Sequence, residues 1–205
     1  MNEKFFSLPK ERRDTIINAA LHVFAKYDYK KASTDEIASL AGISKGLIFH
    51  YFGSKKGLYL FLYDYAAKFI VGEMRKFTDV SETDFFKIIV NSQNCKMSML
   101  AKHPDCMTFI LKAFYEDSPE VKSGVDNTFG DIEKSTAMNF LARADLSKLK
   151  EDVDPEKLVN LILWFAEGFM RTRTPEELTD LAKLNDTYLD YLEMLKRLVY
   201  KPEYL

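Results

Sequence analysis

Apolar residues recur at helical spacing along almost the whole chain, and no β-type alternation of useful length interrupts them. Glycine, proline and polar connections divide this pattern into about nine predicted helices. They cover residues from about 10, then 34–41, 45–52, 54–77, 84–102, 105–117, 120–144, from 155 to about 173, and from 175 to about 200. The sequence therefore predicts an all-α protein.

A stretch near the N-terminus holds two short predicted helices separated by a glycine. Thr34 is a good N-cap for the first helix, and Gly42, which tolerates positive φ, can end it. Ser44 can cap a second helix that runs from Lys45 to about Phe52. Two short helices joined by a tight turn with a glycine form a helix-turn-helix, whose second helix enters the major groove of DNA.

The second short helix has two different faces. Ile48 and Phe52 lie four residues apart, on the side that can pack against the preceding helix. The opposite side carries the cationic, small and aromatic residues Lys45, Gly46, Phe49, His50 and Tyr51. Such a set suits a phosphate-lined groove with base edges on its floor. The alternative, a plain hairpin with Phe49 and Tyr51 in its core, leaves the basic residues at successive helix starts unexplained.

The same stretch contains the gap-free pattern T-x-x-E-I-A-x-x-A-G-I-S-K-G-x-I-F-H-Y-F-x-S-K-x-x-L. From Arg12 to Tyr59 the chain thereby resembles the tetracycline-repressor (TetR) family of bacterial transcription regulators, while the rest matches only in length and helical character. The resemblance implies that Tyr51 and Lys55 hold the DNA backbone. The full set of DNA contacts it implies is Thr34, Ser44, Lys45, Gly46, Leu47, Phe49, His50, Tyr51 and Lys55.

Two positions depart from the family pattern. Asp28 stands where the family usually has glycine after the first helix, and it can adopt the left-handed conformation only at some cost. Phe49 stands where tyrosine is common. The missing hydroxyl leaves an apolar edge that suits a thymine methyl, so this departure bears on operator preference rather than on DNA binding.

Charge is divided unevenly along the chain. The net charge is −2, but residues 1–56 carry ten Lys and Arg against six Asp and Glu, while the rest carries 19 against 25. We interpret most of the early charges, Lys10, Arg12 and Arg13, as solvated, with one or two of them as candidates for a phosphate contact. The charge pattern is consistent with a basic helix-turn-helix domain at residues 1–55 and an acidic domain at residues 56–205. The resemblance implies that the second domain is the ligand-binding and dimerisation domain.

The last two predicted helices carry heptad-like apolar stripes that suit a four-helix bundle. These stripes could simply face the protein's own core. However, Trp164, Leu192 and Val199 add apolar surface on flanking positions, which favours pairing with a second copy. The predicted dimer interface comprises Leu158, Trp164, Phe165, Tyr188, Tyr191, Leu192 and Leu195. A two-fold dimer would present two recognition helices to a palindromic operator.

The middle helices carry many methionine and aromatic side chains, which are more often core than pocket. The family precedent, release from DNA on ligand binding, implies that some of them line a cavity for a small-molecule effector. The candidates are Met99, Phe109, Phe114, Met138, Phe165 and Phe169. Glu116, Glu167 and Arg171 are candidates for a polar contact with that ligand.

Catalysis has little support in the sequence. There is no Gly-rich phosphate loop or nucleophile elbow, and a metal site at Cys95, His103 and Cys106 would lack a fourth ligand. We therefore expect no enzyme, cofactor or metal. A third class, an all-α scaffold that binds only protein, would not explain the presence of Lys45, His50, Tyr51 and Lys55 in the short motif.

No apolar run approaches the length of a membrane span, and Met1–Lys10 lacks the apolar block of a signal peptide. We expect a cytoplasmic, sequence-specific transcriptional regulator. Specifically, we expect a homodimeric repressor that an effector releases from double-stranded operator DNA.

Overall fold

The computed structural model describes residues 3–77, 79, 81–173 and 180–205, and the side chains of these residues except 77 and 129–139. The α-helices, in chain order, are α1 (Glu3–Phe6), α2 (Lys10–Lys26), α3 (Thr34–Ala41), α4 (Lys45–Phe52), α5 (Lys55–Phe77), α6 (Phe85–Lys102), α7 (Pro104–Phe114), α8 (Lys122–Arg143), α9 (Pro155–Arg171) and α10 (Leu181–Val199). Two 3-10 turns, η1 (Leu146–Lys148) and η3 (Pro202–Tyr204), complete the set.

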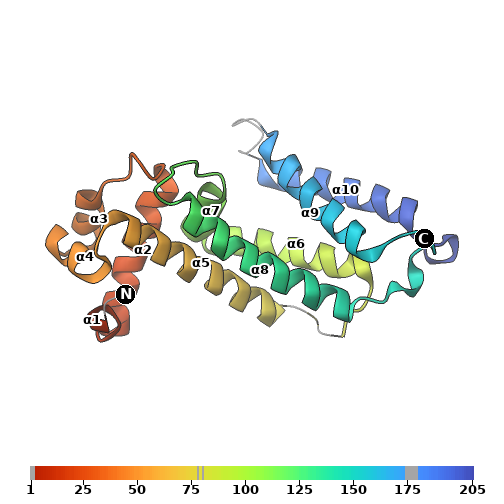
Figure 1. Ribbon diagram of the computed structural model, residues 1–205, viewed down its shortest axis with the longest axis horizontal. Coiled ribbons are helices and arrows are strands. Elements are labelled where there is room, and N and C mark those ends of the chain that lie inside the picture. The colour runs from red at the N-terminus through yellow and green to blue at the C-terminus, as the bar shows by residue number, and fades with distance from the viewer. Residues whose placement is uncertain (1–2, 78, 80, 174–179) are drawn as a thin grey trace. The chain divides into compact units, whose positions relative to one another are not determined.

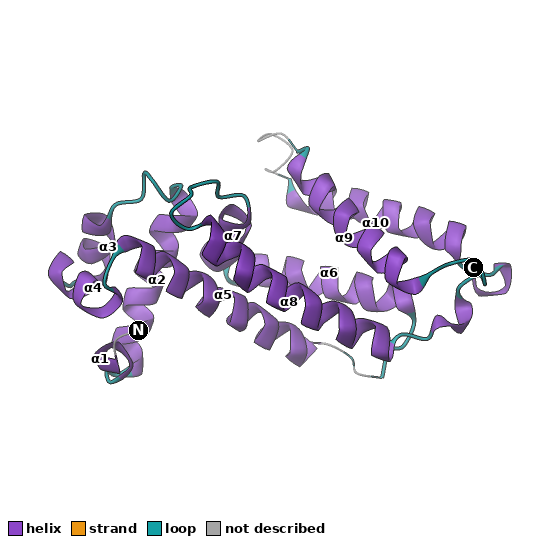
Figure 2. Ribbon diagram, viewed as in Figure 1, coloured by secondary structure: helices purple, strands orange, loops and turns teal. Residues whose placement is uncertain are grey.

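The fold is all-α, as predicted, with a helix-turn-helix near the N-terminus followed by a larger helical region (Figure 2). Over the described residues, β-type pairing is confined to two isolated bridges. The predicted helix bounds agree with the observed ones to within a few residues. The predicted start of the last helix near residue 175 lies outside the described residues, and the short α1 was not predicted. None of the described helices is long and apolar enough to cross a membrane.

The chain divides into two compact units, and the first consists of residues 1–76 and 98–132. Within it, α2 packs against both α3 and α7 (Figure 1). The rings of Phe24, Tyr59 and Phe109 meet in the core, with centroids 5.0 to 6.0 Å apart. Because these rings come from α2, α5 and α7, the short helices α3 and α4 rest on a core built by longer ones.

The second compact unit consists of residues 77–97 and 133–205. Its core is made by the inward stripes of α9 and α10, including Leu158, Ile162, Leu184 and Leu192, all of which are buried. The units of compactness thus differ from the predicted functional division between residues 55 and 56. That division concerns where binding to DNA and ligand occurs, and it remains a prediction.

A buried carboxylate ties together three segments of the second unit. Asp84 Oδ2 lies 2.7 Å from Lys148 Nζ, and Asp84 Oδ1 accepts hydrogen bonds from the Tyr200 hydroxyl at 3.1 Å and the Lys87 backbone N–H at 3.0 Å. Burial alone would raise the pKa of the Asp84 carboxyl, but these hydrogen bonds outweigh it and hold the pKa below its usual value. The ionised carboxylate is therefore stabilised by folding.

Replacing Asp84 by asparagine is expected to lower the free energy of unfolding at pH 7 by about 1.5 kcal/mol, since Lys148 and Tyr200 lose a charged partner. A depressed folded-state pKa gives stability that is present above the unfolded value of about 3.9 and is lost as the pH falls through the folded value. The wild-type advantage should therefore shrink below about pH 4. Urea unfolding followed by circular dichroism between pH 7 and pH 3 measures it. A difference that stays constant over this range would contradict the assignment.

Candidate nucleic-acid interface

The first helix of the motif begins and ends through local side-chain and backbone chemistry. Ser33 Oγ accepts hydrogen bonds from the backbone N–H of Asp35 at 3.2 Å and of Glu36 at 3.4 Å. Ser33 is therefore the N-cap, which corrects the prediction for Thr34, the buried first residue of α3. At the other end Gly42 has φ 60° and ψ 40°, the left-handed conformation expected of it.

The second helix of the motif is held by its apolar side. Ser44 Oγ accepts a hydrogen bond from the Leu47 N–H at 3.3 Å, so Ser44 caps α4 as predicted. Ile48 is fully buried and Phe52 is 9% exposed, and both belong to the core that contains Ile37 of α3. The predicted inner face of α4 is thus confirmed.

The outer side of α4 is open. Lys45, Gly46, Leu47, Phe49 and His50 are exposed, and Tyr51 is half-buried. Leu47 and Phe49 are unusual for a surface, since 37% and 38% of their accessible areas are exposed. A plain hairpin with Phe49 in its core does not fit this exposure. The arrangement leaves a helix that presents aliphatic, aromatic and hydrogen-bonding side chains together.

An N-terminal aromatic cluster supports the end of α4. Phe5 of α1 is buried, and its ring lies 4.9 Å from that of Phe52, 5.8 Å from that of Tyr51 and 5.4 Å from that of Phe61. This contact of α1 was not predicted, although the adjacent Phe5 and Phe6 before a proline were a visible signal. The contact with the Phe5 ring therefore fixes Tyr51 at the edge of the exposed face of α4.

Two arginines of α2 have structural partners rather than only solvent. Arg12 donates a hydrogen bond to the carbonyl oxygen of Gly42 at 2.7 Å, across the turn of the motif. Arg13 donates to the carbonyl oxygen of Phe6 at 2.9 Å. Both arginines therefore have a partner in the protein, and a phosphate contact at either of them remains a prediction. Arg12 joins α2 to the turn that sets the direction of α4.

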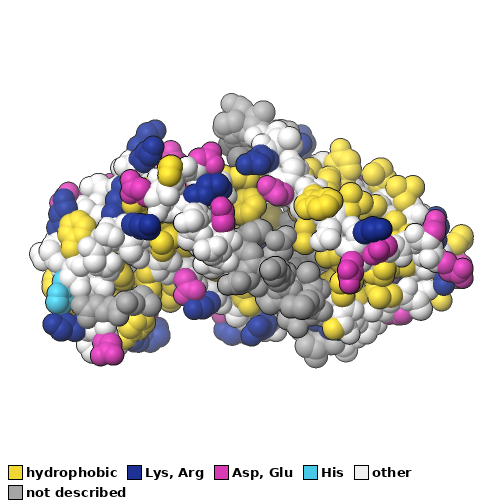
Figure 3. All heavy atoms as spheres, in the orientation of Figure 1, with side chains coloured by type: hydrophobic (Ala, Val, Ile, Leu, Met, Phe, Trp, Pro, Cys, Tyr) yellow, Lys and Arg dark blue, Asp and Glu magenta, His cyan; other side chains and the backbone are white. Residues whose placement is uncertain are grey.

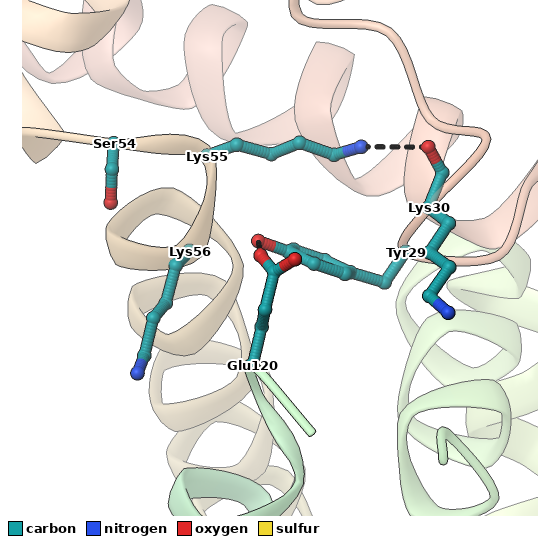
Figure 4. A pocket seen from close by; sticks show the side chains of 6 residues that line it. All are labelled: Tyr29, Lys30, Ser54, Lys55, Lys56 and Glu120. Carbon is teal, nitrogen blue, oxygen red and sulfur yellow. Dashed lines mark hydrogen bonds between the residues drawn. The ribbon is translucent and has the colours of Figure 1, made fainter. Parts of the chain in front are cut away.

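Lys55 lies in an open hollow of about 340 Å³ beside the motif (Figure 4). Its lining residues are Tyr29, Lys30, Ser54, Lys55, Lys56 and Glu120. Lys55 Nζ donates to the carbonyl oxygen of Lys30 at 3.1 Å and lies 4.8 Å from the centre of the Tyr29 ring. Burial lowers the pKa of Lys55, and the nearby Glu120 and Glu116 partly offset this. An ammonium has three protons, so Lys55 can keep Lys30 as a partner and still donate to a phosphate.

The segment before α3 is fixed by two carboxylates. The Tyr29 backbone N–H donates to Glu116 Oε2 at 2.9 Å, and the Tyr29 hydroxyl donates to Glu120 Oε2 at 2.8 Å. Burial and then the bond to Glu120 raise the pKa of Tyr29 to about 12, so the hydroxyl keeps its proton at neutral pH. Asp28 does not adopt positive φ, contrary to the possibility considered from the sequence. Instead its carbonyl accepts from the N–H groups of Lys31 and Ala32.

The predicted ligand residues fall into two different cores. Met99 and Phe109 are buried in the first unit, where Phe114 is half-buried. Phe165 and Phe169 pack against Tyr188 in the second unit, at ring distances of 5.4 and 5.5 Å. The side chain of Met138 lies outside the described residues. The five described side chains are buried or half-buried, and a ligand contact at any of the six positions remains a prediction.

The predicted polar ligand contacts already have protein partners. Besides the Tyr29 N–H, Glu116 accepts the backbone N–H of Ser118 through Oε1 at 3.0 Å. Glu167 and Arg171 lie one turn apart on α9 and form an exposed ion pair at 3.6 Å. A ligand would have to compete with these contacts.

The exposed surface of α9 and α10 is strongly apolar. Figure 3 shows hydrophobic side chains gathered over these two helices. Trp164 is 68% exposed and Tyr191 is 46% exposed, whereas Leu158, Tyr188 and Leu192 are buried in the core of their own unit. Phe165 and Leu195 are half-buried. Leu161, Met194 and Leu198 are also exposed on these helices, and the predicted interface did not include them, although Leu198 belongs to the apolar stripe of the last helix.

Cys106, one of the three residues considered as metal ligands, has an unreactive thiol. Cys106 is buried, and burial raises the pKa of its thiol to about 11, so it stays protonated at neutral pH. The His103 ring lies edge-on to Phe69 at 4.9 Å. Neither residue is arranged as a nucleophile or a ligand.

Comparison with known proteins bears first on the N-terminal part of the chain. Residues 16–61 match the family described as bacterial regulatory proteins, tetR family. A stretch of 60 residues is 43% identical to the HTH-type transcriptional activator FasR of Mycolicibacterium smegmatis, and covers 29% of this chain and 27% of FasR. A stretch of 50 residues is 40% identical to the HTH-type transcriptional repressor AcnR of Corynebacterium jeikeium, and covers 24% of this chain and 26% of AcnR.

The chain thus aligns with 27% of the length of one curated relative and 26% of the other. The similarity in fold extends further. A TetR family transcriptional regulator from Chloroflexus aurantiacus superimposes with a TM-score of 0.64 at 21% identity, covering 98% of both chains. Residues 16–61 are thus similar to the tetR family of bacterial regulatory proteins, as the sequence pattern indicated, and the fold is shared with a TetR family regulator along nearly the whole length.

Proposed function

We propose that this protein is a sequence-specific DNA-binding transcriptional regulator. The observation that carries the proposal is the two-sided α4, whose Ile48 and Phe52 anchor it to the core while its other side is open. A rigid helix with an uncovered outer face can enter a major groove without unfolding. The proteins that the chain is similar to are regulators, and we propose no catalytic activity.

The side chains of the open face suit the reading of bases. Leu47 and Phe49 can make apolar contact with thymine methyl groups, and the Phe49 ring has no hydroxyl that would turn it toward phosphate. Lys45 and His50 can donate to the N7 and O6 acceptors of guanine. We propose that these four residues determine which bases are preferred.

Residues around this face would fix the protein on the DNA backbone. Ser44 is the N-cap of α4. The backbone N–H groups and the helix dipole at this end of α4 favour the binding of a phosphate. Lys55 shares its hollow with Lys30 and Lys56, so three lysines line this hollow beside the motif. Tyr51 stands at the edge with its ring held by Phe5. These contacts carry no information about base sequence, but they set the register of α4 on the DNA.

We propose that the protein acts as a two-fold dimer through α9 and α10. The support is the exposed apolar surface that includes Leu161, Trp164, Tyr191 and Leu198, which is unfavourable in water. A second copy can cover it with the same surface, as two-fold symmetry requires. Such a dimer would carry two α4 helices and recognise a palindromic operator.

We propose further that the dimer represses transcription from the cytoplasm and that a small-molecule effector releases it from the operator. An effector that binds one arrangement of the dimer better lowers its affinity for DNA by the difference in binding free energy. Among the relatives AcnR is named a repressor and FasR an activator, so activation is the second candidate. Transcript levels in a strain that lacks the protein distinguish the two, since loss of a repressor raises them.

A gel-shift assay with the DNA that flanks the protein's own gene tests the central proposal. We expect retardation of a discrete fragment that a shuffled fragment of equal length does not compete away. Candidate effectors added to the complex should restore the free fragment. Equal binding to the native and shuffled fragments would exclude a sequence-specific regulator.

Replacing Lys55 by alanine is expected to weaken binding to all DNA sequences about equally and to reduce the salt slope of log K by about one, as for one lost phosphate contact. A titration at several salt concentrations measures the slope. Lys68→Ala is the control, because Lys68 is an exposed lysine of the same helix with an ion pair to Asp64 at 2.8 Å. If both variants bind as the wild type does, Lys55 contacts no phosphate.

A further inference from the structure

An ion pair crosses the turn of the motif at the start of the reading helix. Asp35 Oδ2 lies 2.8 Å from Lys45 Nζ, which joins the first turn of α3 to the first residue of α4. Both side chains are open to solvent, with 68% of Asp35 and 47% of Lys45 exposed. The cation that opens α4 therefore already has an anionic partner within the protein.

The charge of Asp35 stands out in its surroundings. The segment from Ser33 to Lys56, which contains the residues proposed to contact DNA, holds only two carboxylates. They are Asp35 and the half-buried Glu36. The capping bond of Asp35 uses its backbone N–H, so α3 does not need the ion pair in order to start. A carboxylate is unfavourable beside a phosphate, since like charges repel. The structure thus places an anion beside the cation that begins α4.

We propose that Asp35 is a specificity-determining residue. Its ion pair with Lys45 disfavours contact between Lys45 and phosphates but still allows Lys45 to contact a base edge. This inference rests on the proposed function. Lysine has three N–H donors, so Lys45 can keep Asp35 and still donate to a base acceptor in the operator complex. On non-specific DNA the attraction comes from phosphates, and there Lys45 must leave Asp35 or bring it close to them. The ion pair therefore penalises non-specific binding more than operator binding.

Asp35→Asn tests the proposal, because asparagine keeps the shape and removes the charge. The probes are the fragment retained in the gel-shift assay and its shuffled counterpart, each titrated at several salt concentrations. We expect affinity for the shuffled fragment to rise about fivefold and its salt slope to steepen by about one. Operator affinity should change by less than about twofold, so the ratio of operator to shuffled affinity should fall.

A double-mutant cycle separates this mechanism from a general effect of charge. In the Lys45→Ala background there is no ammonium to release, so Asp35→Asn should leave the slope for the shuffled fragment unchanged. The matched control is Asp64→Asn, which makes the same charge change and breaks an exposed pair with Lys68 at the same 2.8 Å. It should alter neither the slope nor the ratio. Thermal unfolding of each variant verifies that the fold is kept.

The outcomes overturn different statements. If Asp35→Asn changes neither slope nor ratio while the wild type prefers its operator, the role of Asp35 is wrong and the proposed function stands. An equal gain from Asp64→Asn, or from Asp35→Asn without Lys45, also overturns it, since the effect is then one of net charge. If the wild type has no preference between the two fragments, the proposed function and this inference both fail.

Discussion

Replacing Trp164 by glutamate is expected to convert the proposed dimer into a monomer at micromolar concentration. Trp164 is 68% exposed in the protomer, the largest exposed fraction among its described large hydrophobic residues. Tryptophans at the centre of interfaces contribute about 2 kcal/mol or more each, and an unpaired carboxylate buried in their place costs still more. Sedimentation equilibrium measures the result as a shift to the mass of one chain.

The same substitution should reduce operator affinity by about two orders of magnitude. Two heads joined in one dimer bind a palindrome about 10²- to 10⁴-fold more tightly than one head does, because the second contact becomes intramolecular. Binding to DNA that carries a single half-site should change little. This combination separates loss of the dimer from damage to the reading helix.

Trp164→Phe is the matched control. Phenylalanine keeps an apolar ring on the same surface and should preserve the dimer at micromolar concentration. Because Trp164 is exposed, neither substitution should lower the helical content of the protomer in circular dichroism. A Trp164→Glu protein that remains dimeric would exclude this surface of α9 as the interface.

The local chemistry of the motif made its fold predictable from the sequence. Gly42 and Ser44 act through their own backbone and side chain within a few residues, and both behave as predicted. The error at Thr34 has the same origin. Ser33 and Thr34 are adjacent residues with equivalent hydroxyls, and only the backbone conformation decides that Ser33 caps α3.

Periodicity gave the stripes of α9 and α10 but not which stripe faces the core. Each helix carries two apolar stripes, so a heptad pattern alone assigns Leu158 and Leu192 to the same surface as Trp164. The structure separates them, because the first two are buried and Trp164 is open. Deciding between stripes requires the positions of neighbouring helices, which a single sequence does not contain.

Contacts between distant residues were beyond the reach of the sequence. The partners of Arg12 and Lys45 lie 30 and ten residues away along the chain, and neither pair follows from helical spacing. The helix α1 has only four residues, too few to show a period. The sequence therefore predicted α4 itself but not the contacts from Arg12, Asp35 and α1 that hold α4 in place.

Replacing Gly57 by alanine is expected to lower the free energy of unfolding by about 3 kcal/mol, a large cost for a single methyl group. A Cβ atom at Gly57 would lie 2.1 Å from the carbonyl oxygen of Phe52, the last residue of α4. That oxygen belongs to the backbone and cannot rotate away, so α4 and α5 must separate. Operator binding should weaken as well, since the end of α4 is displaced.

Gly72→Ala on the same helix should have the opposite effect on stability. Gly72 lies in the interior of α5. Apart from its chain neighbours and the backbone of its own helix, no atom of the described residues lies within 4 Å of the position that its Cβ would take. Alanine there should raise the free energy of unfolding by about 0.5 to 1 kcal/mol through its higher helix propensity. Urea denaturation of both variants measures the two signs. If Gly57→Ala is as stable as the wild type, close contact between α4 and α5 does not fix the position of α4, and its buried Ile48 and Phe52 must hold it together with the contacts of Phe5 and Arg12.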